Sequence, residues 1–240
     1  MFALLGLASV GHAQGLNGLL GLPDWVALGG SLGLATDDVV RGVTQNDGQV
    51  SPQGDLHLSV GPWYGGITAE GVRRGINASA GAGAELIGYL GWQQHFGDDW
   101  SGSITLRHYD YPGNQFRTRY NYDEFGFSLG WRERVVATVI ASPDTYSQDY
   151  LGHYGSGAAY CYELLGRQPL MAGLAAVAGV GYYDLRRQID VGYAYWSAGL
   201  EHRWRSWAFD LRYVGTDATA RRHFEDDAGN RVVLSAFWLF

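Results

Sequence analysis

The amino-acid sequence predicts an all-β protein, a transmembrane antiparallel up-and-down β-barrel of about twelve strands. Apolar and polar residues alternate in segments of roughly 9–11 residues, the length that a tilted strand needs to cross a hydrocarbon layer. The connections between these segments are alternately short and long, and the last segment ends on an aromatic residue. Alternation alone also occurs in soluble sandwiches, so the other two features favour the membrane barrel.

The composition excludes several classes of protein. Of the 240 residues, 36 are glycine, about twice the usual share, and only 17% are charged, against a typical ~25%. All basic residues are arginine, and the net charge of −7 argues against a nucleic-acid-binding protein, which needs a basic face. The single cysteine, Cys161, excludes a disulfide framework and a cysteine-rich metal site. No apolar run beyond residue 35 is long enough for a membrane-spanning helix.

Residues 1–13 resemble a secretory signal peptide. Phe2–Leu7 is apolar, and Gly11-His12-Ala13 has the small-x-small form of a cleavage site, so cleavage would leave Gln14 first. The basic n-region of a signal peptide is missing, which leaves open a late start codon or a plain apolar N-terminus. Residues 14–240 are expected to form the barrel as one domain.

Twelve segments show the period of two that is typical of strands, with turn residues between them. In residues 206–216, Trp207, Phe209, Leu211 and Tyr213 share one face, and polar or small residues occupy most of the other. In 122–132 the apolar face carries Phe125, Phe127, Leu129 and Trp131. We expect these faces to point outward, toward lipid, and the polar faces to line the lumen. The expected strands are residues 25–35, 53–61, 63–72, 84–95, 100–110, 121–132, 134–142, 156–166, 170–182, 192–203, 206–216 and 231–240.

The lengths of the connections indicate which ends of the strands face the same side. Short connections such as Gly61-Pro62 and Gly166–Pro169 alternate with long ones such as Thr36–Pro52 and Asp217–Asn230. Successive connections of antiparallel strands lie at opposite ends, so one end should carry tight turns and the other long loops. Bacterial outer-membrane barrels have short periplasmic turns and long external loops. The expected location is therefore the bacterial outer membrane.

The C-terminal segment has the form of a closing strand. Counting back by two from Phe240 gives only apolar residues down to Val232. Such a strand is typical of outer-membrane barrels, in which the terminal aromatic resembles a signal read by the barrel-insertion machinery. We therefore assign Phe240 as an assembly signal and expect Val232–Phe240 to pair antiparallel with roughly Trp25–Leu34. A buried final strand of a soluble sheet is the alternative.

The segment Arg41-Gly42-Val43-Thr44-Gln45 resembles the Arg-Gly-aliphatic-Ser/Thr-Gln signature of the TorF-like porins, a family of bacterial outer-membrane proteins. Further matches follow in order over residues 25–240. They are Tyr109-Asp110-Tyr111-Pro112, Asp123-Glu124, Tyr146-Ser147-x-Asp149-Tyr150, Gly181-Tyr182-Tyr183, Gly215-Thr216-Asp217 and the final strand ending in Phe240. The resemblance implies an outer-membrane barrel in which Arg41, Gly42 and Gln45 belong to a conspicuous loop motif. Two departures, Val39-Val40 in place of aromatic residues and Tyr195 in place of an acidic one, leave the contacts of the loop and any ligand open.

The polar strand faces bring charged residues into the lumen. The expected pore-lining residues are Glu70, Arg107, Glu124, Arg132, Glu163, Glu201, Arg203, Asp210, Arg212 and Arg231. Charges in a narrow lumen select ions by sign and size, so the first hypothesis is a porin-like channel for passive diffusion of small hydrophilic solutes. If the same charges pair with one another, they instead hold a closed barrel together, which is the alternative: a structural or surface-interaction protein.

An enzyme is the least favoured class. A lipid hydrolase of the outer membrane needs a serine beside a histidine on the lipid side. His108 is expected to face lipid, but Ser101 and Ser103 lie on the lumen face, and no Gly-x-Ser-x-Gly occurs. We therefore expect no catalytic residues.

No metal or cofactor is expected either, because the seven histidines are scattered without ligand spacing. The expected partners are outer-membrane lipid, small solutes, the insertion machinery and lipopolysaccharide, which the loop pairs Arg73-Arg74, Arg186-Arg187 and Arg221-Arg222 are placed to contact. No nucleic acid is expected, and the sequence leaves a homo-oligomer open.

Overall fold

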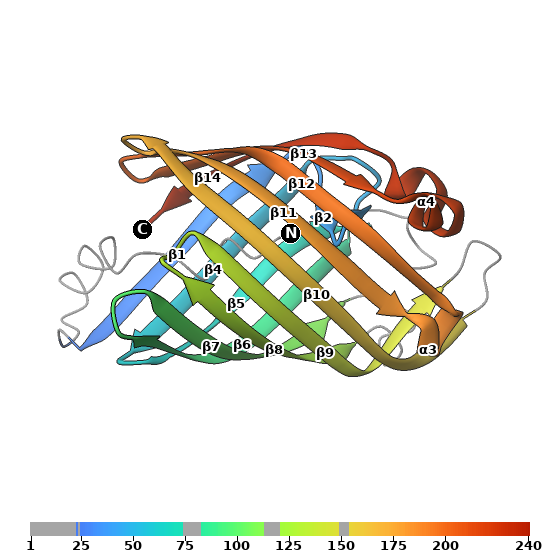
Figure 1. Ribbon diagram of the computed structural model, residues 1–240, viewed down its shortest axis with the longest axis horizontal. Coiled ribbons are helices and arrows are strands. Elements are labelled where there is room, and N and C mark those ends of the chain that lie inside the picture. The colour runs from blue at the N-terminus through green and yellow to red at the C-terminus, as the bar shows by residue number, and fades with distance from the viewer. Residues whose placement is uncertain (1–22, 24, 74–82, 113–120, 149–153) are drawn as a thin grey trace.

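The computed structural model describes residue 23 and residues 25–73, 83–112, 121–148 and 154–240. Within these residues, twelve antiparallel strands form one closed barrel, in which each strand pairs with the barrel strands before and after it (Figure 1). The predicted fold class is confirmed. The expected signal peptide, residues 1–13, lies outside the described residues.

The expected segments all correspond to barrel strands. Nine of them agree with the structure to within two residues at either end, and β9, β10 and β11 are longer or shifted. The strands are β1 (Val26–Ala35), β4 (Ser51–Val60), β5 (Trp63–Val72), β6 (Gly83–Phe96), β7 (Trp100–Asp110), β8 (Tyr122–Trp131), β9 (Val135–Gln148), β10 (Tyr154–Met171), β11 (Leu174–Leu185), β12 (Val191–Trp204), β13 (Trp207–Thr216) and β14 (Arg231–Leu239).

The largest difference lies at the turn between β10 and β11. The sequence suggests a turn at Gly166–Pro169, but β10 continues to Met171, and Ala172 and Gly173 connect it to β11. The pairing of β10 with β11 shifts register between Pro169 and Met171. A proline is tolerated in a strand at such an irregularity because its missing N–H costs no ladder hydrogen bond there.

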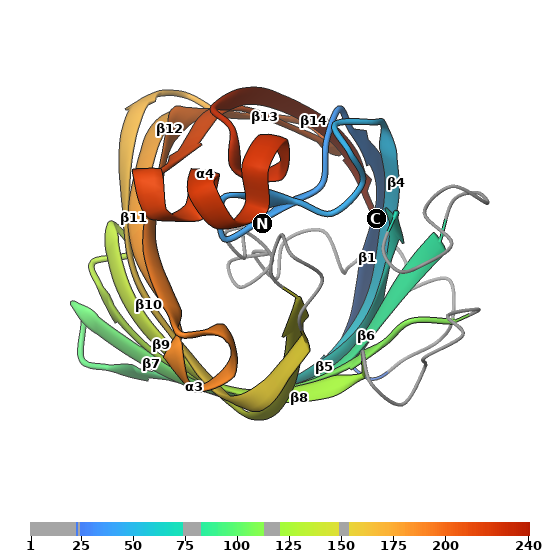
Figure 2. The same ribbon diagram turned by 90° about the vertical axis from the view of Figure 1, so that its right-hand side faces the viewer.

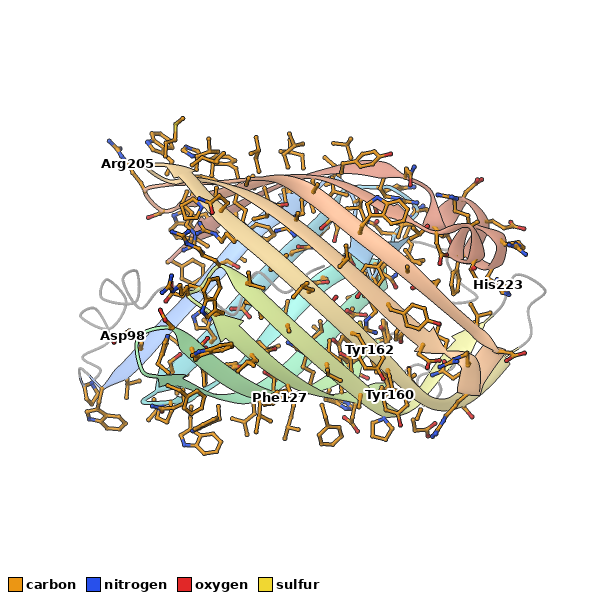
Figure 3. The ribbon with its side chains drawn as sticks, viewed as in Figure 1. Asp98, Phe127, Tyr160, Tyr162, Arg205 and His223 are labelled. Atoms are coloured by element: carbon orange, nitrogen blue, oxygen red, sulfur yellow. The ribbon has the colours of Figure 1, made fainter. Side chains whose placement is uncertain are left out.

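The apolar faces point away from the barrel axis, as predicted. Phe125, Phe127, Leu129, Trp131, Phe209, Leu211 and Tyr213 are between 36% and 54% exposed. Figure 3 shows large side chains projecting outward around the barrel, Phe127 among them. Their neighbours along the strands point inward; Glu124, beside Phe125, is only 1% exposed. Alternation with the apolar residues outside is the pattern of a barrel that is surrounded by lipid.

The last strand closes the barrel against the first. The register of β1 and β14 runs from Ser31 opposite Leu239 to Ala35 opposite Ser235. Beyond it, Gly30 and Phe240 exchange two backbone hydrogen bonds, with N···O distances of 2.9 and 3.1 Å. The ring of Phe240 lies against Gly30, where a Cβ would come within 2.7 Å of it. The predicted antiparallel closure is confirmed, but the paired register spans Ser31–Ala35 and Ser235–Leu239 rather than Trp25–Leu34 and Val232–Phe240.

The two ends of the barrel differ in their connections. We call them the short-turn end, where β12 and β13 are joined through Arg205 and Ser206, and the long-loop end. The long-loop end carries the helices α3 (Arg186–Ile189) and α4 (Ala218–Phe224) and the 3-10 helix η3 (Glu225–Ala228) (Figure 1). Among the described residues, no helix combines the length and apolar character needed to cross a membrane.

The first long connection folds back into the barrel. The sequence suggests an external loop over Thr36–Pro52, but residues 39–44 form a small hairpin of β2 (Val39–Val40) and β3 (Val43–Thr44). Viewed from the long-loop end, this blue segment crosses the interior next to α4 (Figure 2). Period-two patterns identify strands but carry no information about where a loop folds, which is why the sequence does not predict this position.

Candidate functional site in the barrel interior

The hairpin of residues 39–44 is held to the opposite wall by Arg41 at its tip. An Nη2 atom of Arg41 lies 2.5 Å from Oε1 of Glu124, and the two side chains are 9% and 1% exposed. Glu124 also accepts a hydrogen bond of 2.9 Å from the Tyr109 hydroxyl. The guanidinium of Arg41 lies 4.4 Å from the centre of the Tyr183 ring. Arg41 thus connects the hairpin with β8 and β11, across the interior of the barrel.

Gly42 and Gln45, the other members of the loop motif, shape the hairpin. Gly42 has a φ of 83° and lies so close to β12 and β13 that a Cβ would come within 2.4 Å of Thr216 and 2.9 Å of Tyr195. Only glycine meets both demands without strain. Gln45 is 6% exposed, and its side-chain amide donates to the carbonyl of Val43 at 2.9 Å. The motif therefore places Arg41 rather than forming a ligand pocket of its own.

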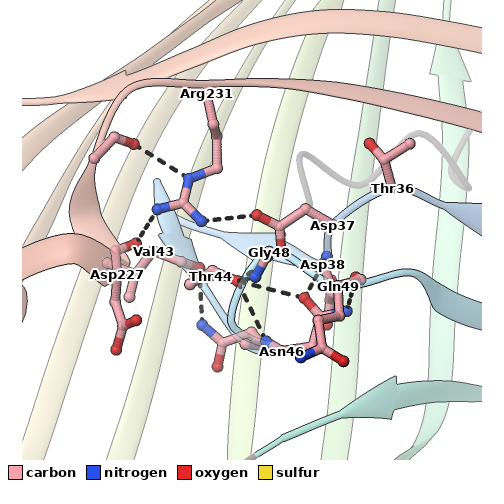
Figure 4. A network of polar contacts seen from close by, with 12 residues as sticks. Thr36, Asp37, Asp38, Val43, Thr44, Asn46, Gly48, Gln49, Asp227 and Arg231 are labelled. Carbon is pink, nitrogen blue, oxygen red and sulfur yellow. Dashed lines mark hydrogen bonds and ion pairs between the residues drawn. The ribbon is translucent and has the colours of Figure 1, made fainter.

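A polar network anchors the base of the hairpin (Figure 4). Nη1 of Arg231 lies 2.7 Å from Oδ2 of Asp37, and the same guanidinium donates to the carbonyls of Asp226 and Asp227, each at 2.8 Å. The Thr44 hydroxyl donates to Oδ1 of Asp37 at 2.6 Å. Arg231 therefore ties the first loop to the last one, and it lies at the long-loop end of the lumen.

Helices α4 and η3 cover part of the long-loop end (Figure 2). Asp217 caps α4, since its Oδ1 accepts from the amides of Thr219 and Ala220, both at 2.9 Å. Phe224 of α4 packs edge-on against Tyr193 of β12, with ring centres 5.5 Å apart. The cover rests on a buried apolar cluster comprising Ile140, Ala159, Cys161, Leu185, Val191, Tyr193, Tyr195, Ala220 and Ala228.

Toward the short-turn end, four charged side chains form a network on the wall of β10, β12 and β13. Arg212 lies 2.9 Å from Oδ2 of Asp210 and 3.0 Å from Oε1 of Glu201. Arg167 lies 3.0 Å from the other oxygen of Glu201. Glu201, Asp210 and Arg212 thus lie together on the lumen wall, on two strands joined by the short turn at Arg205 and Ser206. Arg167 was not among the expected lumen residues. It lies four positions after Glu163 on β10, and residues an even number of positions apart share one face of a strand, so it also points inward.

The facing wall of β4, β5 and β6 carries a second network, which sequence reasoning missed. Asp55 is 5% exposed and lies 2.6 Å from Nδ1 of His57. It also accepts from the hydroxyls of Thr68 at 3.0 Å and Tyr89 at 2.8 Å. The sequence does contain a signal for this network: Asp55 is a charged residue inside an expected strand, and its neighbour Leu56 belongs to the opposite, apolar face. Both networks leave the walls polar and fix the rotamers of the side chains that line the lumen.

The structure places nine of the ten expected pore-lining residues on the inward face and corrects one. Arg132 lies in the short turn after β8, with a φ of 52°, and its Nε donates to Asp99 of the neighbouring turn at 2.8 Å. Both side chains are about half exposed, and this hydrogen bond raises the pKa of Arg132. The expectation was wrong because β8 ends at Trp131, so the alternation that points residues inward stops before Arg132.

His108 faces outward as expected, and its Nδ1 lies 2.8 Å from Oδ1 of Asp123, which is also exposed. No serine hydroxyl is bonded to His108 among the described residues. No group of three metal-ligating side chains occurs among them.

A cavity of about 150 Å³ lies inside the barrel, between the hairpin and the short-turn end. Its lining combines charged residues with a strip of apolar ones from β13 and β14. The lining includes Arg203, Ala208, Asp210, Arg212, Phe237 and Leu239, with Asp37, Asp38, Arg41, Gly42 and Glu70 toward the hairpin and Glu163 and Glu201 on the wall.

Two solved structures, a porin and an outer membrane channel, share this fold. The NanC porin aligns over 89% of this chain and 98% of its own, with a TM-score of 0.54 and 8% identity. An outer membrane channel from Pseudomonas putida F1 aligns over 90% of this chain and 98% of its own, with a TM-score of 0.50 and 11% identity. At such identities the likeness is one of fold, that of a porin-like barrel. A comparison with curated proteins gives no match.

The sequence itself identifies a family. The family model described as "Bacterial protein of unknown function (Gcw_chp)" matches residues 25–240, a range that begins just before β1 and ends at the last residue of the closing strand. The matched range thus contains the whole barrel, the Arg41 hairpin and both loop helices. The chain belongs to the Gcw_chp family of bacterial proteins.

Proposed function

We propose that this chain is a channel of the bacterial outer membrane through which small hydrophilic solutes diffuse passively. The observation that carries the proposal is a closed barrel with an apolar outer face and an interior of charged and hydroxyl-bearing side chains. The outer face suits lipid, and the interior suits water and polar solutes. The fold of the NanC porin and of the Pseudomonas channel supports the proposal, as does the resemblance of residues 41–45 to the TorF-like porins.

The proposed orientation puts the short turns in the periplasm and the long-loop end outside. In that orientation Arg186 and Arg187 of α3 and Arg221 and Arg222 of α4 face the outer leaflet, where lipopolysaccharide carries negative charge. Phe240 then lies at the periplasmic rim, where the insertion machinery would meet it. These partners belong to the proposal, as does the signal peptide that an outer-membrane protein requires.

The test is the conductance of the purified, refolded chain in a planar lipid bilayer. A channel gives discrete current steps whose size increases with salt concentration, and vesicles that contain it swell in small sugars. Neither current nor swelling from a correctly folded chain would contradict the proposal.

A closed barrel is the second candidate, and the Arg41–Glu124 contact across the lumen favours it. A variant in which residues 38–48 are replaced by a short Gly-Ser linker removes the hairpin but leaves the barrel strands intact. If the channel proposal is correct, the native chain conducts and the variant conducts more. A silent native chain together with a conducting variant identifies the hairpin as a plug. Arg132→Ala, in a short turn outside the lumen, is the matched control and should leave the current unchanged.

A further inference from the structure

The cavity between the hairpin and the short-turn end combines charged side chains with an apolar strip, which gives this part of the polar lumen the composition of a binding site. Its apolar strip comes from the inward faces of β13 and β14, where Ala208, Phe237 and Leu239 line it. The wall of a channel for purely hydrophilic solutes has no need of this strip. Small-molecule sites, by contrast, are mostly apolar, with a few placed polar groups.

Small residues flank Phe237 on both neighbouring strands, and the one at position 208 leaves space beside its ring. In the strand register, Ala208 lies opposite Phe237 on one side, and Gly33 lies opposite it on the other. The Phe237 ring covers Gly33, where a Cβ would come within 2.4 Å of it. The short side chain of Ala208 leaves the neighbouring position open. The cavity volume of about 150 Å³ equals that of an engineered protein cavity that takes up one benzene molecule.

Arg203 provides a charge next to this strip. It lies directly opposite Ala208 in the register of β12 and β13, so Arg203, Ala208 and Phe237 form one inward row across three strands. Arg212 and Arg167 are engaged by Glu201 and Asp210. Arg203 lines the same cavity. Among the described residues, no carboxylate forms an ion pair with it.

We propose that this cavity binds a small organic carboxylate with an apolar body about the size of a benzene ring. The carboxylate pairs with Arg203, and the apolar body lies over Ala208 against Phe237 and Leu239. An arginine–carboxylate contact is charge-assisted and directional, which fixes the orientation of the molecule. The opposite orientation is disfavoured because Asp37, Asp38 and Glu70 line the hairpin end of the cavity. The proposal rests on the proposed channel function in that it names the class of solute the lumen holds.

The probe is benzoate, titrated into the full refolded chain in a non-ionic detergent and followed by calorimetry. Acetate has the charge without the body, and benzyl alcohol has the body without the charge. We expect benzoate to bind at least about tenfold more tightly than either, since both features contribute to the free energy of binding. Equal affinity for benzoate and benzyl alcohol, or for benzoate and acetate, would overturn the proposal.

Two variants locate the site. Arg203→Gln should weaken benzoate binding about tenfold or more and leave benzyl alcohol binding unchanged. Ala208→Leu fills the space over Phe237 and should weaken both aromatic probes. Arg132→Gln removes an equal charge outside the lumen and should bind benzoate like the native chain. Unchanged benzoate affinity in either cavity variant, with the native heat-modifiable gel mobility retained, places binding elsewhere and refutes the site.

Conductance measured on the same samples separates this inference from the proposed function. If the chain conducts but does not prefer benzoate, the binding site is refuted and the channel proposal stands. If the chain binds benzoate at Arg203 but does not conduct, the binding site stands and the channel proposal is refuted.

Discussion

Arg41 and Glu124 are the residue pair on which the position of the hairpin depends. Both side chains are at least nine-tenths buried, and removing one member of a buried pair leaves the other charge without compensation, at a cost of about 3–5 kcal/mol. We expect Arg41→Ala to lower the free energy of unfolding by an amount near the lower figure, because Tyr109 still donates to Glu124. Urea titration followed by tryptophan fluorescence measures this loss.

The double variant Arg41→Ala/Glu124→Ala provides the control for this prediction. It removes both charges and should be more stable than Arg41→Ala alone. The exposed pair Arg132–Asp99 should contribute about 0–1 kcal/mol by the same measurement. A loss for Arg41→Ala no larger than that for Arg132→Ala would mean that the hairpin is not held by this contact.

Asp227 gives the loop cover a dependence on pH. Burial raises the pKa of its carboxyl, and the charge of Asp47 raises it further, against the opposing effect of Arg231. A carboxyl whose folded pKa is raised contributes its full stability below the unfolded pKa, about 3.9, and loses it as pH rises through the folded pKa. Asp227→Asn should therefore stabilise the protein at pH 7 by a few tenths of a kcal/mol, because the group is partly exposed. The gain should vanish near pH 3, and a gain that is equal at both pH values would contradict this assignment.

The elements show what local sequence determines in this protein. Alternation predicts the strands because each residue either faces the lipid or the lumen, and β5 and β7 agree with the expected bounds at both ends. Glu201, Asp210 and Arg212 come together because the two-residue turn between β12 and β13 sets the register of these strands. The inward fold of residues 39–44 depends on contacts with residues far away in the sequence, such as that of Arg41 with Glu124. The local sequence around residues 39–44 does not predict such contacts. Arg132 shows that the end of a strand is also hard to predict. β8 ends at Trp131, one residue before the expected end, and this difference places the Arg132 side chain outside the lumen.

The closure of β1 against β14 gives Phe240 a structural role in addition to the assembly role that we propose for it. Deleting Phe240 removes the two backbone hydrogen bonds to Gly30 and the ring that covers it, but leaves the paired register from Ser31 to Ala35 intact. We expect the deletion to slow or reduce insertion into membranes by the cellular machinery more than it lowers the stability of chains that have folded. Insertion yield in cells, compared with the unfolding midpoint of refolded protein, measures the two effects. Trp238→Phe keeps an aromatic near the end and should insert normally; normal insertion of the deletion would contradict the role of Phe240.

The interior as a whole carries more negative than positive charge. Among the described inward residues, the carboxylates are Asp37, Asp38, Asp55, Glu70, Glu85, Glu124, Glu163, Glu201 and Asp210, and the guanidiniums are Arg41, Arg107, Arg167, Arg203, Arg212 and Arg231. The excess is concentrated near the hairpin, where Glu70 lies directly opposite Glu85 in the register of β5 and β6 and Asp38 is buried beside them. Arg203, by contrast, lies toward the short-turn end. The acidic region near the hairpin and the positive charge of Arg203 thus lie in different parts of the lumen.

If the chain forms the proposed channel, ions pass the carboxylates near the hairpin, and potassium should permeate more readily than chloride. In a KCl gradient across a planar bilayer, the reversal potential should have the sign of a cation-selective pore. The double variant Glu70→Gln/Glu85→Gln should move it toward zero, since it removes the negative charge that this facing pair carries. Asp98→Asn/Asp99→Asn removes two charges from a short turn outside the lumen and should leave the potential unchanged. If the lumen variant leaves the potential as it is while the turn variant changes it, the selectivity arises at the mouth of the barrel, and the hairpin region is not on the path of the ions.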